Sequence, residues 1–278
     1  MTLEVFQSLW AMEMRQPGVA ERPLEKNFQM AAEAGYCGLC VDPGISEIQK
    51  VRDMKPLYRQ YDLKCMMNVF PATLEEMKPL LALANEMDAC LVNVIGAVMP
   101  LTVANGVPVI RQWMADARDA GVTLLFETHR ECTLNDLYYT LQLIEQVPEM
   151  RLCADLSHYV IDREMTIPLS DRDAGFMHRI LERSDCFQGR ISNREQIQVQ
   201  IDFPQHQEWV RQFRRWWQDG ISMWRERNED DSTLFFLCEL GPPPYAMTDA
   251  QGLELSDRWS EALTIKTWAE EIWDSVSS

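Results

Sequence analysis

Acidic residues stand directly after three apolar runs in the second half of the chain. Glu127 follows VTLLF, Asp155 follows RLCA and Glu239 follows TLFFLC. A carboxylate can take a proton from carbon or return it, and carboxylate oxygens are also the ligands that Mg²⁺ and Mn²⁺ prefer. The three residues therefore predict proton transfer, metal binding or both, provided that the fold brings them to one place.

Nitrogen-bearing side chains share these positions and could bind a ligand there. The planar guanidinium fork matches planar anions, so we expect Arg190 or Arg194 to bind an oxygen or a carboxylate of a substrate. His158 is expected to hydrogen-bond a substrate hydroxyl or carbonyl oxygen, and His129 either does the same or positions the loop after Glu127. The full set is His129, His158, Gln188, Arg190 and Arg194.

The elements that must position these residues are short apolar runs that alternate with longer stretches of helical period. Strands joined by helical crossovers are parallel, and parallel strands buried on both faces read as continuous apolar runs. Eight runs in 278 residues fit a (β/α)₈ TIM barrel, whereas a doubly wound sheet would usually carry a GxGxxG turn, which is absent. We therefore expect residues 1–278 to form a single barrel domain. The expected strands are 3–9, 36–42, 63–70, 89–96, 122–127, 150–156, 185–191 and 233–240.

Two of the expected helices carry end signals. Residues 23–34 show an apolar face, and Gly35 is expected to end that helix. Thr73 followed by Glu76 predicts a capping box. Pro79 would remove a backbone hydrogen bond in the helix that this box begins, so the helix is expected either to kink at Pro79 or to begin later.

In such barrels chemistry occupies the carboxyl ends of the strands, because eight loops meet there above a packed interior. Strands five to eight end in Glu127, Asp155, Gln188 and Glu239, so four adjacent strands are expected to aim oxygen ligands at one point. Like charges raise one another's pKa, and a divalent metal would let the carboxylates stay ionised. The ligand types favour Mn²⁺ or Mg²⁺, with Co²⁺, Ni²⁺ or Zn²⁺ also possible. Any one acid could instead cap the next helix.

The order of Glu127, the D-x-x-H pair of Asp155 and His158, and Glu239 on the last strands resembles the xylose isomerase-like barrels. The similarity is to the branch of ketose 3-epimerases and hydroxypyruvate isomerases, often called sugar phosphate isomerase/epimerase-like proteins, and in architecture it covers essentially the whole chain. It implies a metal held by Glu127, Asp155 and Glu239. Gln188 stands where the family has histidine, and its carbonyl oxygen is a weaker donor than imidazole.

The resemblance also implies a reaction. Two neighbouring oxygens of a ketose would chelate the metal, which acidifies the carbon-bound hydrogen and stabilises the enediolate formed on its removal. Glu127 and Glu239 on opposite flanks would move the proton, giving epimerisation or the interconversion of aldose and ketose. The implied partner is a small carbohydrate-like molecule, either a neutral sugar or a sugar acid. Relatives often form dimers or tetramers, so a homo-oligomer is possible.

Charge and hydropathy argue against other partners. The formal net charge of −17 would repel a phosphate backbone, so we expect no nucleic-acid partner. No apolar run is long enough to span a bilayer, and the N-terminal residues lack the features of a secretory signal. We therefore expect no membrane partner and a cytoplasmic location.

Two other functions stay open. An apurinic-site endonuclease shares this fold and uses a multi-metal site rich in histidine, which the four histidines and the acidic charge disfavour. The second is a non-catalytic sugar-binding or regulatory barrel with an impaired metal site. Gln188 makes this plausible, because fold alone does not fix function.

Cysteine and tryptophan are expected to serve the core. The cysteines lie mostly inside apolar runs, where a thiol behaves as a small hydrophobe. Cys37 and Cys40 in CGLC would point to opposite faces of a strand, which disfavours a redox pair. The aromatic residues of the stretch 208–224 recur at helical spacing and are expected to pack on the barrel or on a partner subunit.

Five further polar or aromatic residues are weaker candidates. His178 lies on an expected helix and His206 at an expected helix start, where a structural role is the simpler interpretation. Trp10, Asn68 and Asn93 lie near the ends of earlier strands and could line the pocket.

Overall fold

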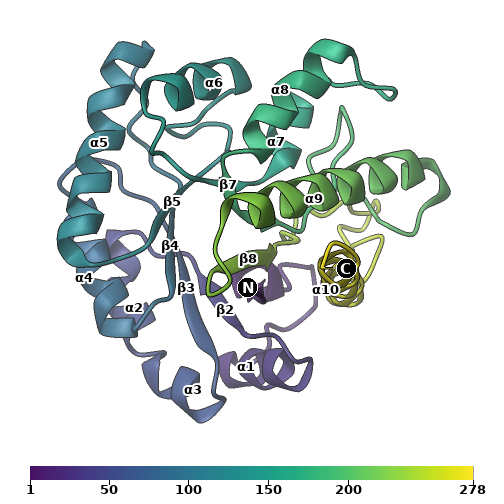
Figure 1. Cartoon of the computed structure of the whole chain (residues 1–278). Helices are drawn as coiled ribbons and strands as arrows, with labels where there is room; N and C mark the ends of the chain where they lie inside the picture. The colour runs from purple at the N-terminus through teal and green to yellow at the C-terminus, as the bar shows by residue number, and fades with distance from the viewer. Residues whose placement is uncertain (278) are drawn as a thin grey trace.

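The computed structural model describes residues 1–277 and consists of eight parallel strands that close into a barrel in chain order, β1 to β8 (Figure 1). The predicted (β/α)₈ barrel is confirmed. Seven of the strands are shorter than their apolar runs, because the flanking residues belong to loops, whereas β1 has the expected length and begins one residue earlier. The strands are β1 Thr2–Ser8, β2 Gly38–Val41, β3 Lys64–Val69, β4 Leu91–Val94, β5 Leu124–Glu127, β6 Leu152–Ala154, β7 Ser184–Gln188 and β8 Thr233–Cys238.

Helices surround the strands, as Figure 1 shows. Within residues 1–277, none of them is both long and apolar enough to cross a membrane. The helices are α1 Leu24–Glu33, α2 Ile48–Arg52, α3 Lys55–Gln60, α4 Met77–Met87, α5 Val103–Ala120, α6 Leu137–Gln146, α7 Leu156–Asp162, α8 Asp171–Leu181, α9 Gln207–Arg227 and α10 Arg258–Ser275.

Two hydrophobic layers hold the barrel together. The larger layer lies between the strands and the helices, and the smaller one fills the barrel interior. Cysteine supplies much of the interior, and every cysteine of the sequence carries a free thiol. This packed interior forms the floor below the loops at the carboxyl ends of the strands. Its buried members are Phe6, Cys40, Met66, Leu91, Leu125, Cys153, Cys186 and Leu237.

The helix-end signals had different outcomes. Gly35 has a positive φ of 70° directly after the C-cap of α1, as a helix-terminating glycine requires. Helix α4 begins only at Met77, so Thr73 does not cap it and Pro79 falls in its first turn, where proline is tolerated. The later start is therefore the alternative that the structure adopts.

The long helix α9 packs its aromatic residues on the barrel, as predicted. The ring of Trp217 meets that of Phe236 on β8 edge to face, with centroids 5.3 Å apart. His206, just before α9, is buried and its Nδ1 lies 2.8 Å from the carbonyl oxygen of Gln200. His206 therefore holds the loop between β7 and α9.

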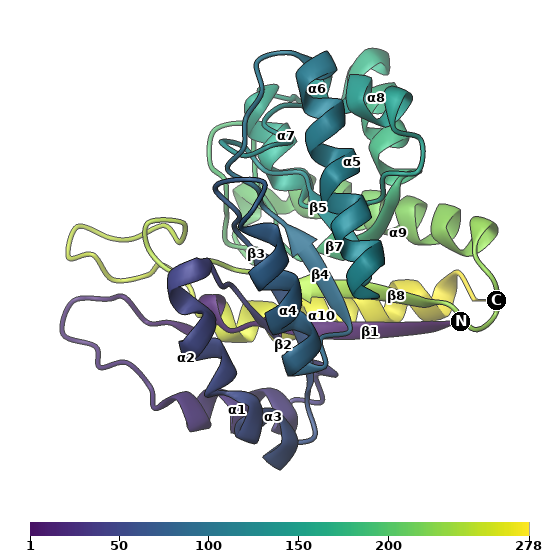
Figure 2. The ribbon, with the colours of Figure 1, turned by 90° about the vertical axis from the view of Figure 1, so that its left-hand side faces the viewer.

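Two long connections project from the same end of the barrel, one between β1 and α1 and one between β8 and α10 (Figure 2). Arg258 at the start of α10 ties them together. Its guanidinium donates to the carbonyl oxygens of Glu13 at 2.6 Å and Leu240 at 3.2 Å, and to that of Ala11. The same side chain pairs with Glu254 at 2.6 Å. This buried arginine therefore joins the connection that carries Trp10 to the connection that carries Tyr245.

Candidate active site

The predicted acids meet at the carboxyl ends of the strands. Glu127 is the last residue of β5, Asp155 follows β6, Gln188 ends β7 and Glu239 follows β8. All four side chains are buried. One carboxylate oxygen each from Glu127, Asp155 and Glu239 lies within 4.8 Å of the others, so the three acids form a buried cluster that could hold a metal ion.

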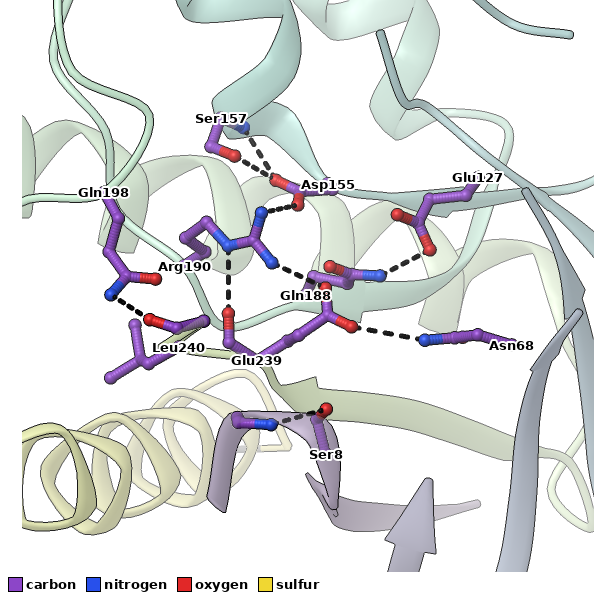
Figure 3. A network of polar contacts seen from close by, with 12 residues as sticks. Ser8, Asn68, Glu127, Asp155, Ser157, Gln188, Arg190, Gln198, Glu239 and Leu240 are labelled. Atoms are coloured by element: carbon purple, nitrogen blue, oxygen red, sulfur yellow. Dashed lines mark hydrogen bonds and ion pairs between the residues drawn. The ribbon is translucent and has the colours of Figure 1, made fainter. Parts of the chain in front are cut away.

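Arg190 lies between two of these carboxylates, as Figure 3 shows. Its Nη2 is 2.7 Å from Glu239 Oε2 and its Nη1 is 3.2 Å from Asp155 Oδ2. The guanidinium also stacks over the ring of Tyr245, 4.8 Å from its centroid, and lies 5.9 Å from that of Trp10. Burial lowers the pKa of Arg190, but Asp155 and Glu239 outweigh burial and leave that pKa raised. The arginine therefore stays charged and balances both acids.

Glu127 has neutral donors instead. Its Oε2 accepts from Gln188 Nε2 at 2.6 Å and from the amide of Asn93. Among the described residues, neither arginine nor lysine pairs with this carboxylate. Burial first, and then the charges of Glu239 and Asp155, raise the pKa of Glu127 well above its ordinary value. Without a cation this side chain therefore tends to hold a proton.

A second acid pair is bridged by Asn68. Its amide donates to Glu239 Oε1 at 3.2 Å and to Asp42 Oδ1 at 3.0 Å. Burial raises the pKa of Glu239 to about 8, opposed by Arg190. Burial also raises the pKa of Asp42 to about 7, opposed by the hydrogen bond from Asn68. Acids with a pKa near neutrality can exchange protons with a ligand.

Two imidazoles lie beside the acids. The ring centroids of His129 and His158 are 3.8 Å apart, and His158 Nε2 is 3.5 Å from Asp155 Oδ2. His129 Nδ1 lies 2.5 Å from the carbonyl oxygen of Arg130. Burial lowers the pKa of His129 to about 4 and that of His158 well below its ordinary value, so both rings are neutral at pH 7.

Asp155 has two tasks. Its Oδ1 accepts from the backbone N of Ser157 at 3.0 Å and caps helix α7, while its Oδ2 faces Arg190 and His158. Helix α7 thereby carries His158 in its first turn and points it at the site. Asp155 therefore caps the next helix, as the alternative interpretation predicted, and also lies in the cluster of acids that could hold a metal ion.

A cavity of about 350 Å³ opens above the cluster, which is enough for a small ligand. Its aromatic wall includes Trp10 and Tyr245, whose rings meet edge to face at 5.2 Å. The lining residues are Trp10, Asp42, Phe70, Ile95, Glu127, His129, Arg190, Glu239 and Tyr245.

Most of the candidates from the sequence gather at this site, but Arg194 does not. Its side chain is 42% exposed and pairs with Glu164 and Glu195 at the surface. His178 also lies elsewhere, exposed beside Glu182 on α8. The expectation that Arg194 contacts a substrate receives no support from this placement.

Sequence reasoning missed four residues that line the pocket, namely the apolar Phe70 and Ile95 and the polar Asp42 and Tyr245. Asp42 ends the apolar run YCGLCVD just as Glu127 ends VTLLFE, so the same signal could have found it. Tyr245 lies in the long connection after β8, and no pattern in that connection predicts a ring stacked on Arg190.

The donor atoms fit a divalent cation in part. Glu127 Oε1 and Gln188 Oε1 are buried without a hydrogen-bond partner among the described residues, and Asp155 Oδ2 has only its ion pairs. Such free acceptors suit a cation. Arg190, however, already balances Asp155 and Glu239, and the Gln188 amide is turned so that its nitrogen faces Glu127. A metal bound by all three acids would have to displace the arginine from them.

Neither a protein-family model nor a curated protein sequence matches the chain. Solved structures do match. A xylose isomerase-like TIM barrel protein from Mycobacterium smegmatis in complex with magnesium aligns with a TM-score of 0.65 and 13% identity, over 99% of this chain and 98% of that one. D-allulose 3-epimerase from Methylomonas sp. in complex with D-allulose aligns with a TM-score of 0.59 and 13% identity, over 97% of each chain.

A sugar phosphate isomerase/epimerase from Parabacteroides distasonis also aligns, with a TM-score of 0.59 and 9% identity, over 100% of this chain and 96% of that one. At these identities the likeness establishes the fold, and the activity is a separate question. The chain therefore has the closed-barrel fold of the xylose isomerase-like TIM barrel proteins.

Proposed function

We propose that the protein is a divalent-metal-dependent isomerase or epimerase of a ketose, sugar acid or related hydroxy-carbonyl compound. The observation that carries this proposal is the pair Glu127 and Glu239, two buried acids with raised pKa values that line one cavity. The solved structures of similar fold include a D-allulose 3-epimerase with D-allulose and a D-psicose 3-epimerase in the presence of D-fructose, which supports this class of substrate.

Proton transfer at carbon needs one carboxylate as base and one protonated group as acid. We assign these roles to Glu127 and Glu239, with the direction set by the substrate. Return of the proton to the opposite face of the same carbon gives epimerisation, and return to the adjoining carbon gives isomerisation. Asn68 and Asn93 hold the two acids in place through the hydrogen bonds that they donate.

A metal would be held by Glu127, Asp155 and Glu239 once Arg190 has moved away from the last two, with Gln188 as a fourth ligand if its amide turns to present the oxygen. When bound, Mn²⁺ or Mg²⁺ would supply the positive charge that acidifies a hydrogen beside a carbonyl group.

Substrate binding falls to His129, His158 and Arg190. His129 can accept a hydrogen bond from a hydroxyl at Nε2, because its Nδ1 donates to the carbonyl oxygen of Arg130. Neutral His158 can donate from one ring nitrogen and accept at the other. Arg190 offers a planar fork, so a carboxylate or a pair of adjacent oxygens is its natural ligand. Trp10 and Tyr245 cover the arginine and exclude water from it.

Deuterium incorporation tests the proposal. The protein with Mn²⁺ or Mg²⁺ is incubated in D₂O with a panel of ketoses and sugar acids, and exchange of carbon-bound hydrogen is followed by NMR. Glu127→Gln and Glu239→Gln should each slow exchange by about 10²–10⁴-fold, the usual contribution of a general acid or base. Arg194→Gln is the matched control and should leave exchange unchanged. Absence of exchange with every compound, or full exchange in both glutamine variants, would contradict the proposal.

A sugar-binding barrel without catalysis is the second candidate. It is favoured by one observation, which is that Arg190 already balances Asp155 and Glu239 while Gln188 occupies the position of the expected imidazole. Its signature would be a thermal shift with sugars that needs no metal, together with no exchange in D₂O.

A further inference from the structure

A second set of metal-ligating atoms lies in the same pocket. One ligand atom each from Glu127, His129 and His158 lies within 4.8 Å of the others. We propose that this set binds a borderline transition metal such as Zn²⁺ or Co²⁺ through Glu127 and the two imidazoles. The ligand set assigned in the proposed function contains no imidazole, so the two sets share Glu127 but favour different metals.

The imidazole nitrogens are free to coordinate. His158 is fully buried, and neither of its ring nitrogens has a hydrogen-bond partner within residues 1–277; Nε2 lies 3.5 Å from Asp155 Oδ2. His129 Nδ1 faces the carbonyl oxygen of Arg130, so Nδ1 carries the proton and Nε2 keeps its lone pair. A hydrogen bond from one ring nitrogen to a backbone carbonyl is the usual way in which proteins orient a metal-binding histidine.

Both imidazoles stand on well-fixed backbone. His129 lies two residues after the end of β5, and the thiol of Cys132 donates to its carbonyl oxygen at 2.7 Å. His158 lies in the first turn of α7, which Asp155 caps. The rings already lie side by side, so binding requires no rearrangement of the helix.

Charge places the cation at Glu127. Asp155 and Glu239 have Arg190 as their positive partner, whereas Glu127 accepts only from the neutral amides of Asn93 and Gln188. Its second oxygen, Oε1, is buried and has no partner in the described part of the chain. A metal at the three-acid position would lie against the guanidinium, whose charge opposes it. Glu127, which has no cationic partner among the described residues, is also the carboxylate that lies beside His129 and His158.

The ligand types then select the metal. Imidazole suits Zn²⁺, Co²⁺ and Fe²⁺, whereas Mg²⁺ prefers a shell of oxygens. Three protein ligands are fewer than these ions require, so positions stay open toward the cavity for water or a small oxygen ligand. This inference does not depend on isomerase activity, because the metal would be detected whatever reaction follows.

X-ray absorption spectroscopy of the Zn²⁺- and Co²⁺-loaded protein tests the inference directly. Imidazole gives a distinctive outer-shell scattering pattern, and we expect two imidazoles in the shell of each metal. A shell with fewer than two imidazoles, or failure of both metals to bind, would overturn the inference. The measurement uses the intact protein and needs no variant.

Substitution of the two histidines gives an independent test of the inference. His129→Ala and His158→Ala should each weaken Co²⁺ binding by more than about tenfold in calorimetric titration, since even groups that only orient a ligand have effects of that size. His178→Ala removes an exposed imidazole and should leave Co²⁺ affinity unchanged. Excess Mg²⁺ should fail to displace Co²⁺. Equal Co²⁺ affinity in all three variants would refute the proposed ligand set. Two imidazoles in the metal shell together with no exchange of substrate hydrogen in D₂O would refute only the proposed function.

Discussion

Arg190 is a buried cation between two buried acids, and it balances much of the charge of the pocket without a metal. Separating charges from water is costly, and such pairs are stable only when their geometry and hydrogen bonds are good. Arg190 meets that condition with ion pairs to Asp155 and Glu239, a hydrogen bond from Nε to the Glu239 carbonyl oxygen, and a ring on which it stacks.

Replacing Arg190 should therefore be costly for stability. In Arg190→Gln two buried carboxylates lose their cation, and we expect the free energy of unfolding to fall by about 3–5 kcal/mol. Arg194→Gln, which removes an exposed arginine with two surface ion pairs, should change stability by less than about 0.5 kcal/mol. Urea unfolding of the metal-free proteins measures both. Equal stability of the two variants would mean that the buried pairs contribute nothing.

The expectation that functional residues lie at the carboxyl ends of the strands located Glu127, Asp155 and Glu239, because the register of a parallel barrel fixes where each strand stops. The same expectation could not show which of Arg190 and Arg194 points into the pocket. Both follow β7, and only the path of the loop turns one guanidinium inward and leaves the other in solvent. Loop paths depend on contacts with other loops, which no local pattern encodes.

Helix α9 lies so close to the barrel that glycine is required at one position. A Cβ at Gly220 would lie 2.5 Å from the ring of Phe187 on β7, so this ring and the helix backbone are in close contact. A Cβ added at Gly175 on α8 would have no neighbouring atom within 4 Å. The two helical glycines form a natural pair for measuring how tightly the outer layer is packed.

Alanine at these two positions should have opposite effects. Gly220→Ala forces the Phe187 ring or the helix to move, and overpacking of this kind costs about 1–3 kcal/mol. Gly175→Ala should instead stabilise the protein by roughly 0.5–1 kcal/mol through helix propensity. Thermal unfolding by circular dichroism checks the sign of each change. A stabilising Gly220→Ala would show that α9 can shift outward freely.

Helix α10 holds the connection between β7 and α9 through one buried acid. Glu261 accepts from the backbone N of Ile201 at 3.1 Å. Burial raises the pKa of Glu261 from about 4.5 to about 7, opposed by this hydrogen bond. Between these pH values the folded protein binds more protons at Glu261 than the unfolded chain, so folding stability falls as pH rises through the window.

Glu261→Gln should remove this pH dependence. Relative to the variant, the wild-type protein should lose up to about 3 kcal/mol of unfolding free energy between pH 4.5 and 7. Urea unfolding at several pH values gives the difference. Glu271→Gln, an exposed acid on the same helix, should follow the wild-type slope. Parallel slopes for the wild type and Glu261→Gln would exclude the raised pKa.

At the scale of elements, the sequence predicted every strand of the barrel but placed strand ends one to three residues too far out at most positions. Apolar character continues into the loops because those loops cover the pocket and the core. The start of α4 differed from the Thr73 signal for another reason. Proline in the first turn sets where that helix can begin, and this steric rule prevails over a capping pattern.

At the scale of the molecule, the net charge of −17 constrains partners. A protein with this charge should not bind DNA through phosphate contacts. We expect no binding of a duplex with an abasic site in fluorescence anisotropy at low salt, with the intact duplex as the control. Binding that weakens as salt increases would support the endonuclease alternative.

The closed barrel itself was predictable from the alternation of runs and helices, because parallel strands leave few other solutions in a chain of this length. The metal preference was less predictable from the sequence. The sequence shows which ligand types are present, whereas the pairing of Arg190 with two of the acids, and the approach of His129 to His158, arise only once eight loops are folded together.

The cap of helix α7 is made by the same carboxylate that faces Arg190 and His158. Occupancy of the pocket and fraying of this helix are therefore linked equilibria. An ion or ligand that rotates Asp155 removes an acceptor from the Ser157 amide, and one that leaves Asp155 in place keeps it. The hydrogen-exchange rate of the Ser157 backbone amide therefore reports whether an ion or ligand in the pocket has moved Asp155, and it can be measured in the absence of any reaction.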